Sequence, residues 1–325
     1  MTLAPSSSPP RVHRQDDGAP VTILLASHRG APFIGAQLRS IAGQTFRNWR
    51  LIVSDDGSDD GTPDIAAGFA ASCPAGQVRV VPGPCRGATP NFLHLLAIAP
   101  DGPLAFCDQD DVWFPDKLAR AMAALAAQDG PAHYAARTII TDAALNPVAP
   151  SRHFCRPLGF RNALVQAVMA GNTSVFDAGA AAILKRCAGA AQDHDIPAHD
   201  WWAYQVSAGA GARLIHDPRP ALFYRQHARS EMGRNDTLPA LARRAGRLMA
   251  GEYGAWLARN HAALDAVRSE IRPDHRAALD RLGDALGQTG PRAAATMARA
   301  GLYRQTATGT AALYAAALAG RLRQA

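Results

Sequence analysis

The chain has 325 residues, of which 48% are hydrophobic and 19% charged, and its formal net charge at pH 7 is +7. This length suits one large domain with or without a smaller appendage, and since no run of about 20 strongly apolar residues occurs, we expect no transmembrane helix. The charge excess lies after residue 236, where 13 arginines stand against 6 acidic residues, so we expect no nucleic-acid partner.

The N-terminus and the cysteines bear on location. Residues 1–20 are rich in Ser, Pro and Arg and lack the apolar core of a secretory signal, so we expect a disordered tail there. The five cysteines are odd in number and form no C-x-x-C pair, which argues against a disulfide framework and a structural zinc site. We therefore expect a cytoplasmic protein.

Strands and helices alternate over the first third of the chain. Apolar runs predict buried strands at 21–26 and 50–53 and further strands at 78–81 and 103–107. Helical spacing of apolar residues predicts helices at 33–42, 63–71 and 91–99. This alternation predicts right-handed crossovers and a doubly wound, mainly parallel sheet, an α/β fold.

The elements downstream are less regular. We expect helices at 117–128, 161–169 and 180–187, strands at 133–142 and 215–225, and a loop or strand at 171–176. From residue 239 the chain is Ala- and Arg-rich helix, with breaks near Pro273 and Pro291. We therefore expect an α/β domain over 21–236 and a helical extension over 237–325.

Polar clusters follow three of the predicted strands. They are Ser27-His28-Arg29, Asp55-Asp56 and Asp108-Gln109-Asp110-Asp111. Sheets of this kind bind ligands beyond the carboxyl ends of their strands, so we expect all three clusters in one crevice.

The third cluster holds three carboxylates within four residues. Their mutual repulsion favours a bound cation, and oxygen ligands suit Mg²⁺ or Mn²⁺ bridging to substrate phosphates. The alternative, a helix N-cap, needs only one Asp. We assign Asp108 and Asp110 to the ion and expect Asp111 to cap the helix that starts beside Pro115.

Three further groups could take part in chemistry. A carboxylate of Asp55 or Asp56 could accept hydrogen bonds from a base or ribose while the other fixes the turn. Asp200, beside Trp201 and Trp202, has the partly apolar surroundings that suit a general base, whereas both indoles are expected in the core and Asp195 is a decoy. Arg225 could bind phosphate, and His227 is either a metal ligand or structural.

Residues 21 to about 230 resemble the family 2 glycosyltransferases of GT-A fold, most closely their rhamnosyltransferase-like members. The motifs that carry the resemblance are VTILLASHRG, QTFRNWRLIVSDDGSDDGT, FCDQDDVWFPDKL, HDWWAY and YRQH. It implies a Rossmann-like nucleotide-binding half, with nucleotide-sugar contacts from Ser27, Arg29, Asp55, Asp56, Arg86, Asp108, Gln109, Asn172, Trp201 and Arg225. It also implies Asp110, Asp108 and His227 at the metal and Asp200 as the general base. The chain departs from the family at Cys85, where Asn is common.

The resemblance implies an inverting transfer of a sugar from a dTDP- or UDP-sugar, rhamnose being one candidate, to a hydroxyl of a polysaccharide or glycolipid acceptor. Two alternatives stay open, a sugar-phosphate nucleotidyltransferase and a non-catalytic nucleotide-sugar-binding protein. The basic segment 299–323 is either a helix resting on the cytoplasmic face of a membrane or a helix that caps the domain.

Overall fold

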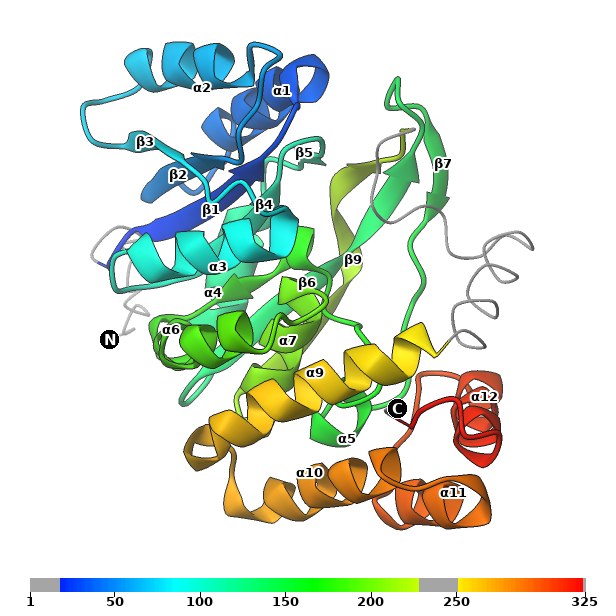
Figure 1. The fold of residues 1–325 in the computed structure, drawn as a ribbon. Helices are drawn as coiled ribbons and strands as arrows, with labels where there is room; N and C mark the ends of the chain where they lie inside the picture. Colours follow the sequence, from blue (N-terminus) through cyan, green and yellow to red (C-terminus); the bar gives the residue numbers. More distant parts are fainter. Residues whose placement is uncertain (1–17, 228–250, 324–325) are drawn as a thin grey trace, which may run out of the picture.

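The computed structural model describes residues 18–227 and 251–323 (Figure 1). Residues 1–17 of the expected N-terminal tail lie outside the described residues, and so does the expected domain boundary at residue 236. The limits of the domains therefore stay a proposal.

One sheet runs through the described part of the chain, with strand order β3-β2-β1-β4-β8-β6-β9-β5 and β7 paired to β6. Its first half is parallel and consists of β1 (Val21–Ser27), β2 (Trp49–Asp55), β3 (Val78–Pro82) and β4 (Leu104–Asp108). The four predicted strands are thus confirmed, and β1, β2 and β4 are largely buried, whereas β3 is half-buried or exposed along its length. The order 3-2-1-4 is that of a Rossmann-like half.

The second half of the sheet mixes directions. It contains β5 (Val112–Trp113), β6 (Ala132–Thr141), β7 (Pro147–Pro150), β8 (Val175–Phe176) and β9 (Arg213–Arg225). β6 and β9 are parallel, whereas β8 is antiparallel to both β4 and β6. Strands β5 and β7 were not predicted. β5 is two residues long and pairs with the distant β9, and β7 is a short strand with a proline at each end that pairs with the preceding β6, so local sequence carries little signal for either.

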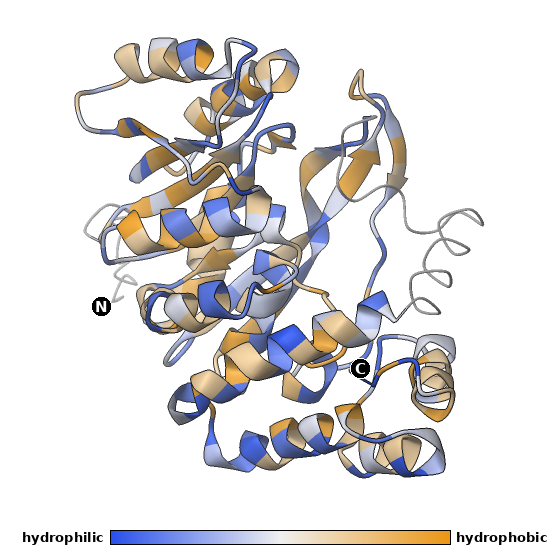
Figure 2. Ribbon diagram, viewed as in Figure 1, coloured by the Kyte–Doolittle hydropathy of each residue, from blue (hydrophilic) through white to orange (hydrophobic). Residues whose placement is uncertain are grey.

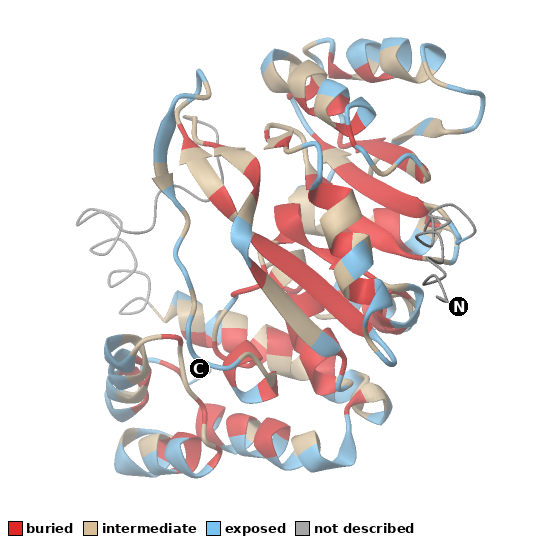
Figure 3. Ribbon diagram, turned by 180° about the vertical axis from the view of Figure 1, so that it is seen from behind, coloured by how far each residue is buried: buried red, intermediate tan, exposed pale blue. Residues whose placement is uncertain are grey.

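Helices cover both faces of the sheet. They are α1 (Ala31–Ala42), α2 (Thr62–Ala71), α3 (Ala88–Ile98), α4 (Lys117–Ala126), α5 (Phe160–Ala163), α6 (Ala178–Asp193) and α7 (His199–Gly209). Side chains alternate across β1: Ile23 and Leu25 pack in one core with α1 and α4, and Leu24 packs in the other with α3, α6 and α7. The central strands are hydrophobic in Figure 2 and buried in Figure 3. This is a doubly wound sheet, as predicted.

The predicted helix at 161–169 is wrong in extent, because α5 ends at Ala163. Beyond it, the carbonyl oxygen of Val165 accepts hydrogen bonds from the Tyr253 hydroxyl and the Arg304 guanidinium. Two side chains that are distant in sequence thus bind the Val165 carbonyl oxygen, which in a longer helix would accept a hydrogen bond from a backbone amide of the same helix. Helix α6 is longer than predicted, and its N-cap Asp177 accepts a hydrogen bond from the Ala180 amide at 2.7 Å.

The C-terminal helices are α9 (Glu252–Ala266), the 3₁₀ turn η2 (Arg268–Glu270), α10 (Pro273–Leu286), α11 (Gly290–Arg299) and α12 (Ala307–Leu318). The breaks predicted near Pro273 and Pro291 are confirmed, since both prolines occupy the first turn of a helix. Leu257, Leu279 and Leu313 share one hydrophobic core with α6 and α7. No helix of residues 18–227 or 251–323 is long and apolar enough to span a membrane.

Candidate active site

The three polar clusters lie side by side at one edge of the parallel sheet. In the strand register, Ser27 of β1 is opposite Asp55 of β2, and Ala26 is opposite Asp108 of β4. The expected convergence of the clusters at the carboxyl ends of the strands is confirmed. The residues of the three clusters are therefore neighbours at this edge of the sheet.

Asp55 and Asp56 both organise the loops of this edge. The Asp55 carboxylate accepts hydrogen bonds from the Ser27 hydroxyl at 3.0 Å and from the backbone amide of Ser58 at 2.8 Å. Asp56 accepts from the backbone amides of Cys85 at 2.7 Å and Gly87 at 2.6 Å, which ties the loop after β2 to the loop after β3. Each Asp56 oxygen keeps a second acceptor position that a base could use.

The two arginines expected near the nucleotide lie in different places. Arg29 donates its backbone amide to the Ser58 hydroxyl, and its half-exposed guanidinium pairs with Asp59 at 2.8 Å on the surface. Arg86 is exposed and stands between the two amides that bind Asp56. The backbone of Arg86 therefore lies beside Asp56, whereas the guanidinium of Arg29 is bound to Asp59.

Gln109 joins the acidic cluster to the loop after β1. Its amide accepts from the backbone N–H of His28 at 3.0 Å and donates to the carbonyl oxygen of His28 at 2.9 Å. A Cβ atom added to Gly30 would collide with this amide. Glycine at position 30 therefore leaves the space in which Gln109 fixes the distance between the two loops.

We expect Gly30→Ala to weaken binding of the donor about 5- to 30-fold, because the added methyl group displaces Gln109 from both hydrogen bonds with His28. Titration calorimetry with the donor and Mn²⁺ measures the effect. Gly68→Ala is the matched control, since no atom lies within 4 Å of its added Cβ. Wild-type affinity in Gly30→Ala would contradict the role of Gln109 in fixing the distance between the two loops.

Asp110 contacts His227, with 2.7 Å between its Oδ2 atom and the imidazole Nε2. The His227 ring stacks on Phe33 at 4.4 Å between centroids. Arg225 donates from Nε to the Asp110 carbonyl oxygen at 2.8 Å and from Nη1 to the Ala143 carbonyl oxygen. Arg225 thus holds the backbone of the acidic loop, and the structure brings His227 to Asp110.

The expectation that Asp111 caps a helix is wrong. Helix α4 begins at Lys117 with Asp116 at its N-cap position, and β5 intervenes. Asp111 is fully buried and accepts from the Asn172 amide at 2.7 Å and from the backbone N–H of Arg225 at 3.3 Å. Burial, together with the charges of Asp110 and Asp108, raises the pKa of Asp111 well above its ordinary value. Asn172 is therefore tied to the acidic cluster.

Lys117 lies behind the acidic cluster and was not predicted as a functional residue. Its side chain is fully buried, with Nζ 3.3 Å from the centroid of the Trp113 ring. Burial lowers the pKa of Lys117 to about 7, while the charges of Asp111 and Asp108 act to raise it. The signal in the sequence was a lysine six residues after the acidic cluster, in a segment that contains only one other basic residue nearby, Arg120. Such a lysine could have been predicted to place its positive charge next to the cluster.

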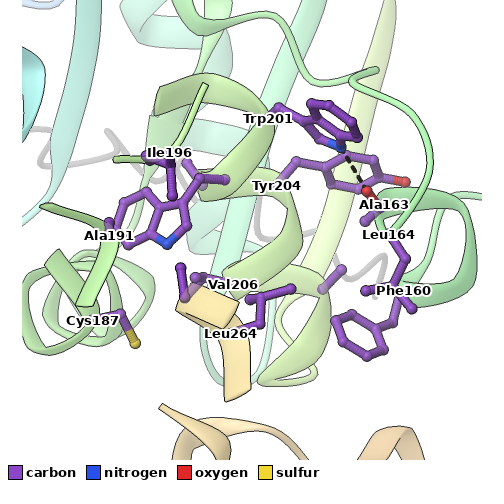
Figure 4. Close-up of a cluster of buried hydrophobic side chains, with 14 of the residues drawn as sticks. Phe160, Ala163, Leu164, Cys187, Ala191, Ile196, Trp201, Tyr204, Val206 and Leu264 are labelled. Atoms are coloured by element: carbon purple, nitrogen blue, oxygen red, sulfur yellow. Dashed lines mark hydrogen bonds between the residues drawn. The ribbon is translucent and has the colours of Figure 1, made fainter. Parts of the chain in front are cut away.

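Asp200 lies in the first turn of α7. Its Oδ2 atom accepts from the backbone N–H of Gly171 at 3.3 Å and its Oδ1 atom from that of Trp201 at 2.7 Å. Trp201 is 5% exposed and donates its indole N–H to the Ala163 carbonyl oxygen, which places it in the core (Figure 4). Asp195 is exposed and pairs with Arg259.

Tyr224 is a half-buried tyrosine of β9. Burial raises the pKa of this phenol, and the charges of the carboxylates of Asp108, Asp111, Asp110 and Asp200 raise it further. All four carboxylates therefore lie within electrostatic reach of one side chain of β9. The arrangement combines a carboxylate–imidazole pair, a network of hydrogen-bonded loops and the separate carboxylate of Asp200.

Residues 22–188, just over half of the chain, match the family described as Glycosyl transferase family 2. The chain belongs to glycosyltransferase family 2. The resemblance seen in the five motifs is therefore confirmed.

Relatives of this glycosyltransferase include the dTDP-rhamnosyl transferase RfbG of Shigella flexneri, 27% identical over 239 residues, which are 68% of this chain and 78% of that protein. The UDP-Glc:alpha-D-GlcNAc-diphosphoundecaprenol beta-1,3-glucosyltransferase WfgD of Escherichia coli is 31% identical over 99 residues, 30% of this chain and 38% of that protein.

Two solved structures share the fold of this glycosyltransferase. The mannosyltransferase PcManGT from Pyrobaculum calidifontis, in complex with GDP-Man and Mn²⁺, has a TM-score of 0.50 at 20% identity, with 95% of this chain and 88% of that chain covered. S. aureus TarS 1–349 has a TM-score of 0.50 at 14% identity, with 82% of this chain and 87% of that chain covered. The expected α/β fold of GT-A type with C-terminal helices is confirmed.

Proposed function

We propose that this glycosyltransferase is an inverting, metal-dependent enzyme that moves a sugar from a nucleoside diphosphate sugar to a hydroxyl group of a glycan or glycolipid in cell-surface glycan synthesis. The observation that carries the proposal is the pair of Asp110 and His227, 2.7 Å apart. Asp200 lies close to the same cluster, because Gly171 donates a hydrogen bond to Asp200 and the next residue, Asn172, donates one to Asp111. Residues 21–236 are the proposed catalytic domain and 237–325 its helical extension.

The Asp110–His227 pair fits a divalent ion. Two neighbouring ligands of an octahedral ion with bonds of about 2.1 Å lie about 3 Å apart, close to the 2.7 Å between these two atoms. Asp108, at the end of β4, is the proposed further ligand. Within residues 18–227 and 251–323 no three His, Cys, Asp or Glu side chains are close enough together to hold a metal ion by themselves. Diphosphate oxygens and waters would therefore complete the coordination shell of the ion. Mg²⁺ or Mn²⁺ bound there would offset the charge of the leaving diphosphate.

The protein residues divide the remaining work. Asp56 and Arg86 bind the nucleotide, and Gln109 keeps the acidic loop at a fixed distance from the loop after β1. Asp200 takes the proton of the acceptor hydroxyl as that oxygen attacks the anomeric carbon from the face opposite the diphosphate. The C1–O bond to the diphosphate breaks in the same step, so the anomeric configuration inverts and no covalent enzyme intermediate forms.

The donor is proposed from the relatives. RfbG is named as a dTDP-rhamnosyl transferase, which favours a dTDP-sugar, and WfgD uses UDP-Glc by its name, so a UDP-sugar is the second candidate. A cytoplasmic location and a contact of segment 299–323 with the membrane face stay predictions. Against that contact, Arg304 points inward to Val165 and Tyr253.

A panel of dTDP-, UDP- and GDP-sugars tests the proposal. We expect metal-dependent release of a nucleoside diphosphate from one donor and, once an acceptor is found, a product of inverted anomeric configuration by NMR. Release of pyrophosphate from a sugar phosphate and a nucleoside triphosphate would instead indicate a nucleotidyltransferase. That alternative is less favoured, because Arg29, the basic side chain best placed for a triphosphate loop, pairs with Asp59. Binding without turnover of any donor would indicate a non-catalytic protein.

A further inference from the structure

The C-terminal extension binds the segment that leads into the active site. We call residues 159–173 the bridge segment. Gln305 donates its backbone amide to the side-chain oxygen of Gln166 at 2.7 Å and its side-chain amide to Asn162 at 3.3 Å. Asn162 in turn donates to the carbonyl oxygen of Tyr303 at 3.0 Å. The extension is therefore connected to this segment by specific polar contacts as well as by the shared core.

A second set of contacts converges on Val165 of the bridge segment. Its carbonyl oxygen accepts from the Tyr253 hydroxyl and, at 3.2 Å, from the Arg304 guanidinium. Arg304 also donates to the Tyr253 hydroxyl at 3.0 Å. The three groups form a closed triangle between α9, the α11–α12 loop and the bridge segment. Such a network restrains the backbone at a point where no helix does so.

The other end of the bridge segment contacts the proposed catalytic groups. The backbone N–H of Gly171 donates to Asp200 at 3.3 Å, and the Asn172 amide donates to Asp111 at 2.7 Å. Only residues 167–170 separate this end from the part held by the C-terminal extension. A shift of the bridge segment therefore moves the Gly171 N–H, which donates a hydrogen bond to Asp200.

Tyr253 also supports Asp200 from the other side. Its ring stacks on Trp201, with centroids 6.1 Å apart and 9° between the planes. Trp201 follows Asp200 in α7 and donates its indole N–H to the Ala163 carbonyl oxygen of the bridge segment at 2.7 Å, drawn as the dashed line in Figure 4. Both neighbours that donate backbone amides to the Asp200 carboxylate, Gly171 and Trp201, are thus linked to Tyr253.

We propose that Tyr253 and Arg304 of the C-terminal extension are positioning residues that orient the carboxylate of Asp200 through the bridge segment and Trp201. The inference rests on the proposed function, because it assigns these residues a part in the action of Asp200 as general base. It makes the C-terminal helices a component of the active site.

Tyr253→Phe tests the proposal, because it removes the hydroxyl from the triangle and keeps the ring on Trp201. We expect kcat for nucleoside diphosphate release to fall roughly 5- to 100-fold, while the KM of the donor and the affinity for Mn²⁺ stay at wild-type values. Arg304→Gln should show the same split. Hydrogen exchange over residues 160–173 should become faster in both variants.

Tyr314→Phe is the matched control, because Tyr314 lies in the same extension and donates its hydroxyl to a backbone carbonyl, that of Leu302, at 2.7 Å. It should lose a similar amount of stability but keep kcat. Equal kcat in wild type, Tyr253→Phe and Arg304→Gln would overturn the inference while leaving the proposed function intact. Absence of turnover in the wild type would overturn the proposed function and the catalytic part of the inference, and unchanged hydrogen exchange would overturn its structural part.

Discussion

Asp200→Asn is expected to reduce sugar transfer by about 10²- to 10⁴-fold in kcat, the range that a general base contributes. An amide has nearly the same shape as the carboxylate, and its oxygen still accepts a hydrogen bond from Gly171 or Trp201. The variant should therefore fold and bind the metal and donor, but it cannot take the proton of the acceptor. Steady-state kinetics measures the loss of kcat, and calorimetry measures donor binding in the presence of Mn²⁺.

Asp195→Asn is the control for this experiment. Asp195 also follows a histidine, but its carboxylate is exposed and pairs with Arg259 on the surface. Removing one charge from such a pair changes stability by about 1 kcal/mol or less and should leave kcat unchanged. If Asp200→Asn loses donor binding as severely as Asp110→Asn, Asp200 binds the donor and is not the base.

Asp110→Asn is expected to abolish metal-dependent donor binding and, with it, transfer. Asparagine is a much weaker ligand for a divalent ion, and His227 and the proposed ligand Asp108 are then left without the carboxylate that pairs with the imidazole. We expect Mn²⁺ affinity to fall by about 100-fold or more. Titration with Mn²⁺ followed by calorimetry measures it, and EDTA should inactivate the wild type until Mn²⁺ or Mg²⁺ is restored.

Asp116→Asn controls for the loss of a carboxylate near the acidic loop, because Asp116 is about half exposed and lies at the start of α4. It should bind Mn²⁺ as the wild type does. Unchanged Mn²⁺ binding in Asp110→Asn, or activity of the wild type that survives complete chelation, would show that this residue is not a metal ligand.

The parallel half of the sheet was predictable because its information is local. The apolar run 21–26 is buried on both faces of the sheet, and three of the four strands end at a polar cluster. The convergence of Asp55 and Asp108 then follows from the parallel direction of the strands. The motifs within these strands also led to the family that the comparisons confirmed.

The extent of α5 and the place of Asp111 were not predictable in this way. An aspartate before a helix has the same local appearance whether it caps that helix or is buried. Here the pairing of β5 with Phe223 and Leu222 of β9 separates Asp111 from α4 and brings Arg225 to it. The same holds for Val165, whose partners Tyr253 and Arg304 are distant in sequence.

The sequence by itself determined the α/β class and the succession of the first four strands and their helices along the chain. It also determined the aspartate-rich turns that follow the second and fourth strands. These depend on periodicity and on residue types within a few positions of one another. Only the tertiary structure decided which groups meet: Asp110 with His227, Asp111 with Asn172, and Asp200 with a segment held by the C-terminal helices. The physical reason is that such contacts join strands and loops through packing of distant segments, which no local pattern of residues records.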